Sequence, residues 1–594
     1  MSKTLKKKTI IILIAIIIIQ SIYLGVTFGL CKKGFHSDEL WNYGISNSFD
    51  SKELMITNSG ESLSNQWLNS SRFIDYITVN SGQRFAYNKV YYNASKDLNP
   101  PFQQFILHTV CSFFPGIFSK WFGFSINILS FIGTQIYLFL IAFKMTKRKL
   151  VAIATILLFG FGVGALNIVF FLRIYALGVF FAVMFAYYSH IIYENRREKI
   201  KPLNFILLFV SCFLGAFTLH EFLVYAFAIT ICYTLYFLFS KNFKVFLAHG
   251  CSCLFAVILS FLAFPSTTAN MVGNGETLSY ARASYPFGMQ YKFYWYFLTR
   301  DLFGIHTDPL PNPYFEWFLG ILVFVTILLI PVIVLIRKEE WFHKFIEFIK
   351  KDTKNTISKL KYFQFSLLPH IISIIFIVII ASLRTSIYSM GAYSNRYLFL
   401  IYPLLVLVLL IALYYSVSFV IRNKYKVVIS IILSLSVILS ITSHIYTDNL
   451  YYFDFPKEGF TFDDFEKDAN SIMVLSADWA ALLFAPYLGD TGSFYVANYN
   501  NYSDKDILVG IDLDSPLYLI IEQSLLIKDE ETKKLYYSDE GEKLRQYYYD
   551  GDVILNFFDS LDAAENIDYV GHQVLFQRDF YIYKFEKFGG LSIQ

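Results

Sequence analysis

Charged residues are scarce in this sequence: Asp, Glu, Lys and Arg make up 16% of its 594 residues, whereas hydrophobic residues make up 55%. So apolar a composition excludes an ordinary soluble protein of this length. Cysteine is also scarce, because only six are present and none lies in the C-terminal part. Nothing in this pattern requires a disulfide framework, and Cys251-Ser-Cys253 is read as two small buried thiols or, alternatively, as a metal or redox pair.

Long apolar runs are what the sequence has instead, and several reach the roughly 18–20 residues that cross a bilayer. Thr9–Leu30 is predicted to be a retained first span, since it is too long for a signal peptide and no small-x-small cleavage pattern follows it. Further spans are predicted to start near Gly123, to form hairpins in Leu150–Tyr193 and Leu203–Phe239, and to lie near 245–264, 317–336, 366–384, 397–420 and 427–445. We therefore expect a mainly α, multi-pass plasma-membrane protein with about eleven transmembrane helices.

Charge is divided unevenly along the chain. Residues 446–594 hold 11 Lys and Arg against 28 Asp and Glu, whereas residues 1–445 hold 39 against 18. Short basic clusters such as Lys144–Lys149 and Arg422–Lys426 are expected on the cytoplasmic side of the membrane. This pattern predicts a transmembrane domain over 1–445 with a cytoplasmic N-terminus and outer loops at 31–122 and 265–316. An acidic extracytoplasmic domain over 446–594 is predicted to follow it.

Two regions outside the spans have periodic patterns. Phe102–Phe118 places Gln103, Gln104, His108 and Ser112 on one helical side and apolar side chains on the other, which is typical of a helix lying in the membrane interface. The tail alternates strand-like and helical segments, which predicts a small α/β domain. Its predicted strands are Ser471–Leu475, Ser493–Ala497, Pro516–Ile521 and Gln573–Lys584, and its predicted helical segment is Lys533–Phe558.

Polar residues from separate segments reach the outer side of the membrane in this topology. Carboxylates there offer a general base or a metal ligand, and arginines offer planar forks for a phosphate. Each residue also has a plainer interpretation, because a carboxylate can end a span, an arginine can cap a hairpin and a histidine can pack. The residues that converge are His36, Asp38 and Glu39 after the first span, Asn99 before Pro100-Pro101, and Arg173, His220 and Arg396 at span ends.

Five short motifs in residues 1–445 together resemble those of GT-C glycosyltransferases, in particular bacterial members akin to protein O-mannosyltransferases and the lipid A aminoarabinose transferase. Each motif is weak alone, and the resemblance depends on their order and spacing. One departure is Asn99, since relatives often have His or a cation before the Pro-Pro pair. The motifs are His36-Ser37-Asp38-Glu39-Leu40-Trp41, Asn99-Pro100-Pro101-Phe102, Leu172-Arg173-Ile174-Tyr175-Ala176-Leu177, Thr218-Leu219-His220 and Asn395-Arg396-Tyr397-Leu398.

The resemblance implies a GT-C fold and an inverting transfer of a sugar from a polyprenyl-phosphate donor on the outer face of the membrane. It implies that Asp38 is the general base, with Glu39 as the second catalytic carboxylate. Arg173 and Arg396 would hold the leaving phosphate. The further substrate-binding residues that it implies are His36, Asn99, Tyr175, His220 and Tyr397.

The partners and cofactors follow from this interpretation only in part. The donor is a membrane lipid, the acceptor is left open as a glycan, a lipid or a protein, and no nucleic acid is expected. Asp38 and Glu39 offer ligands for a divalent cation, but the need for a metal is left open. No Rossmann fingerprint is evident, which agrees with a donor that is not a nucleotide sugar. A membrane transporter and a non-catalytic cell-envelope assembly protein are the alternative functions.

Overall fold

The structure is a computed structural model of the whole chain, in which two compact units are distinguished. It describes residues 7–49, 53–97, 99–267, 294, 297–302, 353–384, 394–420, 434, 451, 457–498, 501–503, 507–509, 515–525, 551–559, 567–576 and 578–585. Unit 1 contains residues 1–26, 125–170 and 174–451, and unit 2 contains residues 27–124, 171–173 and 452–594. This division differs from the predicted boundary after residue 445, because the first outer loop groups with the C-terminal tail.

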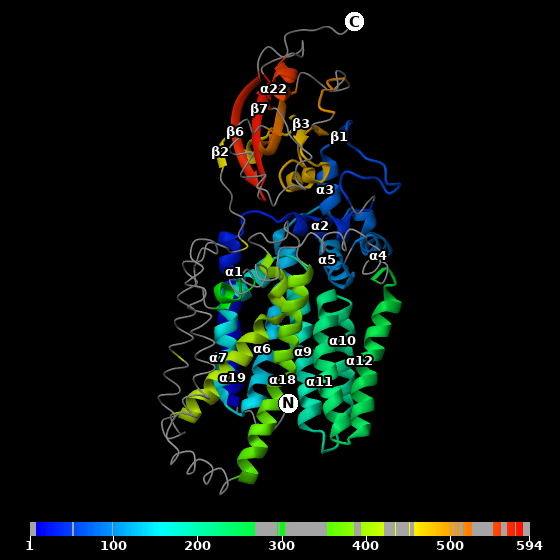
Figure 1. Ribbon diagram of the computed structural model, residues 1–594. Coiled ribbons are helices and arrows are strands. Elements are labelled where there is room, and N and C mark those ends of the chain that lie inside the picture. The colour runs from blue at the N-terminus through cyan, green and yellow to red at the C-terminus, as the bar shows by residue number, and fades with distance from the viewer. Residues whose placement is uncertain are drawn as a thin grey trace. The chain divides into compact units, whose positions relative to one another are not determined.

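Unit 1 is helical. Helices α9, α10, α11 and α12 pack on one another, and α18 packs against α11 and α19 (Figure 1). Left-handed residues end two of these helices, since Lys147 follows α6 with φ 55° and Lys241 follows α11 with φ 57°. The helices are α1 (Lys7–Cys31) and α6 (Lys120–Thr146), which both continue into unit 2, and α7 (Lys149–Gly160), α8 (Val163–Phe170), α9 (Tyr175–Glu194), α10 (Pro202–Ala216), α11 (His220–Phe239), α12 (Phe243–Ala263), α18 (Thr353–Arg384), η3 (Ser394–Ile401) and α19 (Tyr402–Val420).

These helices confirm a multi-pass membrane protein. Among the described residues, six helices are long and apolar enough to cross a bilayer, or seven if α7 and α8, which meet at 56°, form one span. The first span and both predicted hairpins are present, and Arg173 lies between α8 and α9 as expected. The predicted spans at 317–336 and 427–445, and most of the outer loop at 265–316, lie outside the described residues. The number of about eleven therefore stays a prediction.

Unit 2 begins with the first outer loop, which folds into short helices and one strand. These elements are α2 (Ser37–Asn47), β1 (Trp67–Asn69), α3 (Ser71–Ile77), η1 (Ser81–Gln83), α4 (Tyr87–Ser95) and α5 (Phe102–Ser112). Helix α5 confirms the predicted two-sided pattern, because Gln103, Gln104, His108 and Ser112 are all buried. The apolar side is more accessible, and Phe113 directly after the helix is 62% exposed. A helix with its polar side against protein and its apolar side outward suits an interface with lipid.

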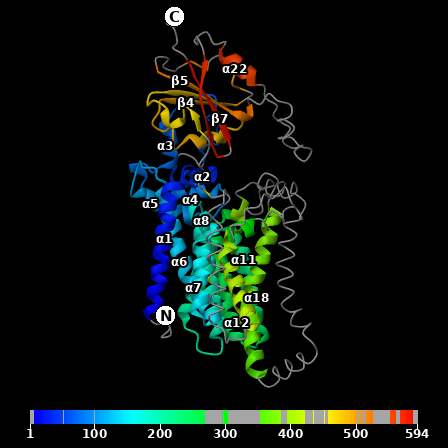
Figure 2. The same cartoon turned by 90° about the vertical axis from the view of Figure 1, so that its left-hand side faces the viewer.

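The tail and the first outer loop together form a mixed sheet, which among the described residues has seven strands in the order β1-β4-β3-β5-β7-β6-β2. Strands β4, β5 and β7 of this sheet are labelled in Figure 2. The central strands β4, β3 and β5 are parallel, and the neighbours on both sides are antiparallel. Strand β1 comes from the first outer loop, so the loop and the tail share one sheet. The remaining strands are β2 (Lys457–Gly459), β3 (Asn470–Leu475), β4 (Ser493–Asn498), β5 (Leu517–Glu522), β6 (Ile567–Leu575) and β7 (Arg578–Phe585).

Both faces of the sheet are covered, which agrees with strands β3 and β5 being buried throughout. Helix α22 (Gly551–Asp559) contributes Ile554 and Phe558 to the core on one face. On the other face η6 (Asp478–Phe484) places Phe484 4.9 Å from Phe580, measured between ring centroids. The short helices η5 (Phe462–Asp464) and η7 (Gln523–Leu525) complete the described elements of the tail.

Three predicted strands of the tail are confirmed within one residue at each end, but the fourth is wrong. Gln573–Lys584 is not one strand, because the chain turns at Phe576 and pairs with itself as β6 and β7. The apolar alternation continues through the turn, which hides it in the sequence, and Phe576 adopts φ 41° without a glycine. Of the predicted helical segment Lys533–Phe558, the part before Gly551 lies outside the described residues.

Candidate active site

Helix α2 begins with a capping box, which fixes the backbone of the charged residues that follow the first span. The imidazole Nδ1 of His36 accepts a hydrogen bond from the Asp38 backbone N–H at 2.9 Å, and the Glu39 carboxylate accepts one from the His36 N–H at 2.7 Å. Histidine takes the place that Ser or Thr usually has in this motif. Asp38 therefore lies in the first turn, where the helix dipole favours a negative charge.

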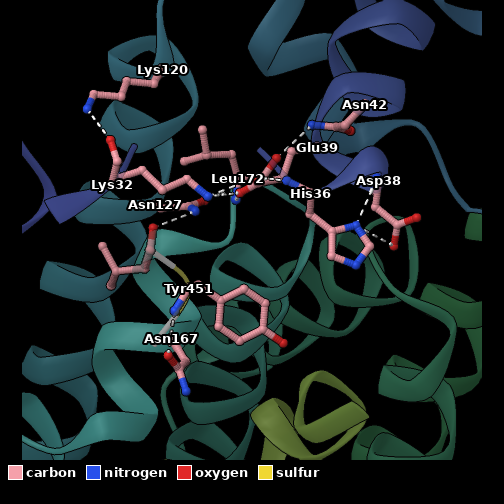
Figure 3. Close-up of polar contacts among 11 residues, drawn as sticks. Lys32, His36, Asp38, Glu39, Asn42, Lys120, Asn127, Asn167, Leu172 and Tyr451 are labelled. Atoms are coloured by element: carbon pink, nitrogen blue, oxygen red, sulfur yellow. Dashed lines mark hydrogen bonds and ion pairs between the residues drawn. The ribbon is translucent and has the colours of Figure 1, made fainter. Parts of the chain in front are cut away.

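Glu39 forms a fully buried ion pair with Lys32. The Lys32 Nζ lies 2.9 and 2.8 Å from the two carboxylate oxygens, and both side chains are 0% exposed (Figure 3). Burial raises the pKa of the Glu39 carboxyl and lowers the pKa of Lys32 to about 8. The positive charge of Lys32 opposes the rise at Glu39, and the negative charge of Glu39 opposes the fall at Lys32. A buried pair of this kind fixes geometry, because each charge requires the other.

The hairpin loop Phe171–Arg173 is joined to α2 through three hydrogen bonds. The Leu172 N–H donates to Glu39 Oε1 at 2.8 Å, and the Leu172 carbonyl accepts from the Asn42 amide at 3.1 Å (Figure 3). Arg173 Nη1 donates to the Asp38 carbonyl at 2.8 Å. The guanidinium of Arg173 and the first turn of α2 are thus held together, although 135 residues separate Arg173 from Asp38 in the sequence.

Arg173 has donors left for an anion. Its side chain is nearly buried, with the residue 9% exposed, and its Nε is a buried atom that has no hydrogen-bond partner among the described residues. A buried guanidinium N–H without an acceptor is costly, so such a group is expected to meet an acceptor when a ligand is bound. The site therefore offers a fork for a phosphate or a carboxylate next to Asp38.

Asp38 differs from Glu39 in its access to solvent. The side chain of Asp38 is 22% exposed, and its Oδ2 lies 4.0 Å from Nδ1 of His36 (Figure 3). Its backbone is fixed by the hydrogen bonds of its N–H and its carbonyl, so the carboxylate stands on a rigid base. Accessibility and rigid support are what a general base needs, whereas both oxygens of Glu39 are engaged by internal donors.

The His36 ring lies between two aromatic residues of unit 2. Its centroid is 5.2 Å from that of Phe171 in the hairpin loop and 3.8 Å from that of Phe576 in the β6–β7 turn. Because Nδ1 accepts a hydrogen bond, this geometry describes the neutral imidazole with its proton on Nε2. Asn99 lies further along the first outer loop, where its amide is 3.4 Å from a carboxylate oxygen of Asp97.

The other predicted residues belong to unit 1. Tyr175 is the first residue of α9, and its ring centroid is 5.6 Å from that of Phe399 in η3. His220 is buried at the start of α11, and Arg396 lies over the ring of its neighbour Tyr397 in η3, 5.1 Å from the centroid. Unit 1 thus brings Tyr175 and the η3 segment together, and the substrate-binding roles of these four residues stay predictions.

Two groups in these units were missed by the sequence reasoning. Lys32 looked like an ordinary basic residue at the end of a span, and only its spacing of seven residues before Glu39 hints at a pair. Asp301 lies in unit 1 and is 1% exposed. Its carboxylate accepts hydrogen bonds from Asn395 at 2.8 Å and from Tyr402 at 2.5 Å, which fixes the two ends of η3.

The donors on α2 do not make a complete cation site. No group of three or more His, Cys, Asp or Glu side chains that could hold a metal ion occurs in the described part of the chain. Mg²⁺ and Ca²⁺ take six or more oxygen ligands, and the Glu39 oxygens already accept from Lys32, His36 and Leu172. A divalent cation ligated by Asp38 and Glu39 stays a prediction.

Solved structures of known proteins are similar to this chain, and they include two structures of ArnT. No protein-family model matches the chain, and no curated protein matches it. The crystal structure of ArnT from Cupriavidus metallidurans bound to undecaprenyl phosphate is 11% identical, covers 96% of this chain and 97% of that chain, and gives a TM-score of 0.44. The apo structure of the same ArnT is 11% identical, covers 91% and 95%, and gives 0.39.

Proposed function

We propose that this protein is a membrane glycosyltransferase that moves a sugar from a polyprenyl-phosphate donor to an acceptor hydroxyl. The observation that carries the proposal is the junction in unit 2 of an accessible carboxylate, Asp38, with a nearly buried guanidinium, Arg173, on a multi-pass membrane protein. Transfer from a lipid-borne sugar phosphate needs a base for the acceptor and a cation for the departing phosphate. Asp38 offers the base, and Arg173, whose guanidinium donates a hydrogen bond to the Asp38 carbonyl, offers the cation.

The proposed reaction balances without a cofactor. Asp38 takes the proton of the acceptor hydroxyl, and the oxygen forms a bond to the anomeric carbon. The bond from that carbon to the phosphate oxygen breaks, and its electron pair leaves with the polyprenyl phosphate. Attack from the face opposite the leaving group inverts the anomeric centre. The phosphate departs as an anion, so it needs stabilisation by charge and no general acid.

Arg173 is proposed to stabilise the departing phosphate. Its Nη1 is occupied by the Asp38 carbonyl, and its Nε is the buried donor that a phosphate oxygen would satisfy. Because the guanidinium is already fixed, little reorganisation is required as negative charge develops on the leaving group. The guanidinium is tied to the backbone of the residue that carries the proposed base, through the hydrogen bond from Nη1 to the Asp38 carbonyl.

Glu39 is proposed to be a positioning residue and not a second base. Its two oxygens accept from Lys32, His36 and Leu172, so it joins the first span, the cap of α2 and the hairpin loop. His36 is proposed to offer its Nε2–H to a sugar hydroxyl or a phosphate oxygen beside Asp38. Transfer is proposed to occur on the extracytoplasmic side, with the N-terminus in the cytoplasm.

The test is turnover of purified protein in lipid nanodiscs with a panel of undecaprenyl-phosphate sugars. The expected result is release of undecaprenyl phosphate from at least one donor, with an inverted anomeric configuration in the product observed by NMR. Arg173→Gln is expected to lower this rate. The half-buried Arg196, which lies over the Tyr193 ring in unit 1, is the control in Arg196→Gln. Asp38-dependent uptake of a solute without donor cleavage would instead identify a transporter.

A further inference from the structure

Unit 2 contains a cavity next to the proposed site that the donor chemistry does not use. Its volume is about 260 Å³, and it lies between the loop before α2 and the β6–β7 hairpin of the tail. Pockets that enclose whole drug-sized ligands are about 300–1,000 Å³, so this cavity suits a single ring and not an oligomer. The tail and the first outer loop both contribute to it, which gives the tail a part in recognition.

The lining combines flat aromatic surface with a fixed amide. Phe35, Tyr487 and Phe576 provide rings, and Gln573 lines the cavity while it is only 1% exposed. The Gln573 Oε1 accepts a hydrogen bond from the Phe462 N–H at 3.0 Å, which orients the amide and leaves its NH₂ group as a donor. Apolar faces with a few oriented polar groups match a sugar ring, which has C–H faces and a rim of hydroxyls.

The rim of the cavity is basic in an acidic part of the chain. Lys33 and Lys457 line it together with a single acidic residue, Asp463, which pairs with Lys457 at 2.7 Å. Lys457 and Asp463 come from the tail, where 28 acidic residues stand against 11 basic ones, and Lys33 from the first outer loop leaves the lining with one excess positive charge. A second cavity of about 230 Å³ in unit 2 has Glu53 and Asp478 in its lining and no lysine or arginine. An anion is therefore favoured at the first cavity only.

One residue connects this cavity to the proposed base. Phe576 lines the cavity, and its ring centroid is 3.8 Å from that of His36, whose Nδ1 is 4.0 Å from the Asp38 carboxylate. Phe576 holds this position with a left-handed φ of 41° at the hairpin turn, a conformation uncommon for an aromatic residue. Strain of this kind persists where the surrounding structure requires the side chain in one place.

We propose that the cavity is the acceptor subsite and that it binds a sugar ring that carries a negative charge. That the bound sugar is the acceptor rests on the proposed function, but the binding of an anionic sugar can be measured without any donor. The two lysines would pair with the charge, the rings would cover the face of the sugar, and Phe576 would orient it beside His36 and Asp38.

The experiment uses three probes on the full chain in nanodiscs, observed by saturation-transfer NMR. Methyl β-glucuronide carries both features, methyl β-glucoside has the ring without the charge, and glycerol 1-phosphate has the charge without the ring. The glucuronide is expected to bind about tenfold more tightly than either of the others, which corresponds to one charge-assisted hydrogen bond of about 1.4 kcal/mol. Equal affinity for all three, or no glucuronide binding to the wild type, overturns the proposal.

Matched variants locate the binding. Val574→Trp fills the first cavity and is expected to abolish glucuronide binding, whereas Ile56→Trp fills the second cavity and is expected to leave it unchanged. Lys457→Ala is expected to weaken binding about tenfold. Lys584→Ala is its control, since both lysines are 44% exposed and both pair with a carboxylate that is 59% exposed. Equal effects of the two lysine variants, or binding that survives Val574→Trp in a folded protein, contradict the assignment.

The two proposals fail in different measurements. Donor hydrolysis by the wild type, in which water takes the place of the acceptor hydroxyl, tests the glycosyltransferase, and glucuronide binding without any donor tests the subsite. A wild type that binds the glucuronide but cleaves no donor would retain the subsite and remove the proposed reaction. Donor cleavage without glucuronide binding would retain the proposed reaction and remove the subsite.

Discussion

The Lys32–Glu39 pair gives the sharpest energetic prediction. Both side chains are 0% exposed, so removal of one leaves the other buried without its counter-charge. Breaking a buried pair in this way costs about 3–5 kcal/mol. Lys32→Met and Glu39→Gln are therefore each expected to destabilise the clasp of the hairpin loop on α2 by about this amount. The double variant is expected to lose clearly less than the sum, because it leaves no buried charge uncompensated.

Amide hydrogen exchange measures this loss at the clasp itself. The Leu172 N–H donates to Glu39 Oε1, and its protection depends on the pair. At about 1.4 kcal/mol for each factor of ten, its exchange is expected to be about 10²- to 4 × 10³-fold faster in either single variant. Lys584→Met, which breaks an exposed pair, is expected to change exchange at Leu172 by less than threefold, as exposed pairs are worth about 0–1 kcal/mol. Unchanged protection in both single variants would refute the reasoning.

Three further predictions concern Arg173, Asp301 and pH. Arg173→Lys removes the planar guanidinium and its Nε–H, so KM for the polyprenyl-phosphate sugar is expected to rise about ten- to hundredfold. An unchanged KM in steady-state kinetics would contradict the proposal that Arg173 binds the phosphate. Asp301→Ala leaves the Asn395 amide and the Tyr402 hydroxyl without their acceptor, so it is expected to lower the apparent melting temperature. Asp301→Asn keeps an acceptor oxygen and is expected to lower the melting temperature less. Equal losses in the two variants would contradict this role of Asp301. Burial lowers the pKa of Lys32 to about 8, so the Lys32–Glu39 pair is expected to lose its cation above that pH. The value of kcat is therefore expected to fall with an apparent pKa of about 8. A kcat that is constant up to pH 9.5 would be inconsistent with this.

The membrane part of the fold was predictable because a bilayer leaves few choices. Apolar runs of sufficient length must be helices, and the hairpins around Arg173 and His220 follow from the length of each run. The shared sheet was not predictable. Strand β1 is a three-residue segment, Trp67–Asn69, whose partner β4 begins more than 400 residues later, and nothing local marks so short an edge strand. The β6–β7 turn was missed because Phe576 stands where a glycine or asparagine would normally mark it.

The site was predictable in its members more than in their roles. Asp38, Glu39 and Arg173 were selected from sequence, and the structure brings all three together in unit 2. Spacing could not separate the two adjacent carboxylates, because only tertiary contacts show that Glu39 is buried against Lys32 while Asp38 retains access to solvent. For the same reason Asp301 escaped notice, since the groups that define it come from η3 and α19, nearly a hundred residues further along the chain.

The single-turnover rate at which Asp38→Asn cleaves an undecaprenyl-phosphate sugar, with water as the acceptor, is the most direct test of the central claim. A general base contributes about 10²- to 10⁴-fold, and the amide keeps the shape of the side chain but cannot take the proton. The rate is therefore expected to fall by that factor, while Asp75→Asn, at an exposed aspartate of α3 in the same unit, is expected to match the wild type. Donor cleavage by Asp38→Asn at the wild-type rate would contradict the claim that this carboxylate activates the acceptor.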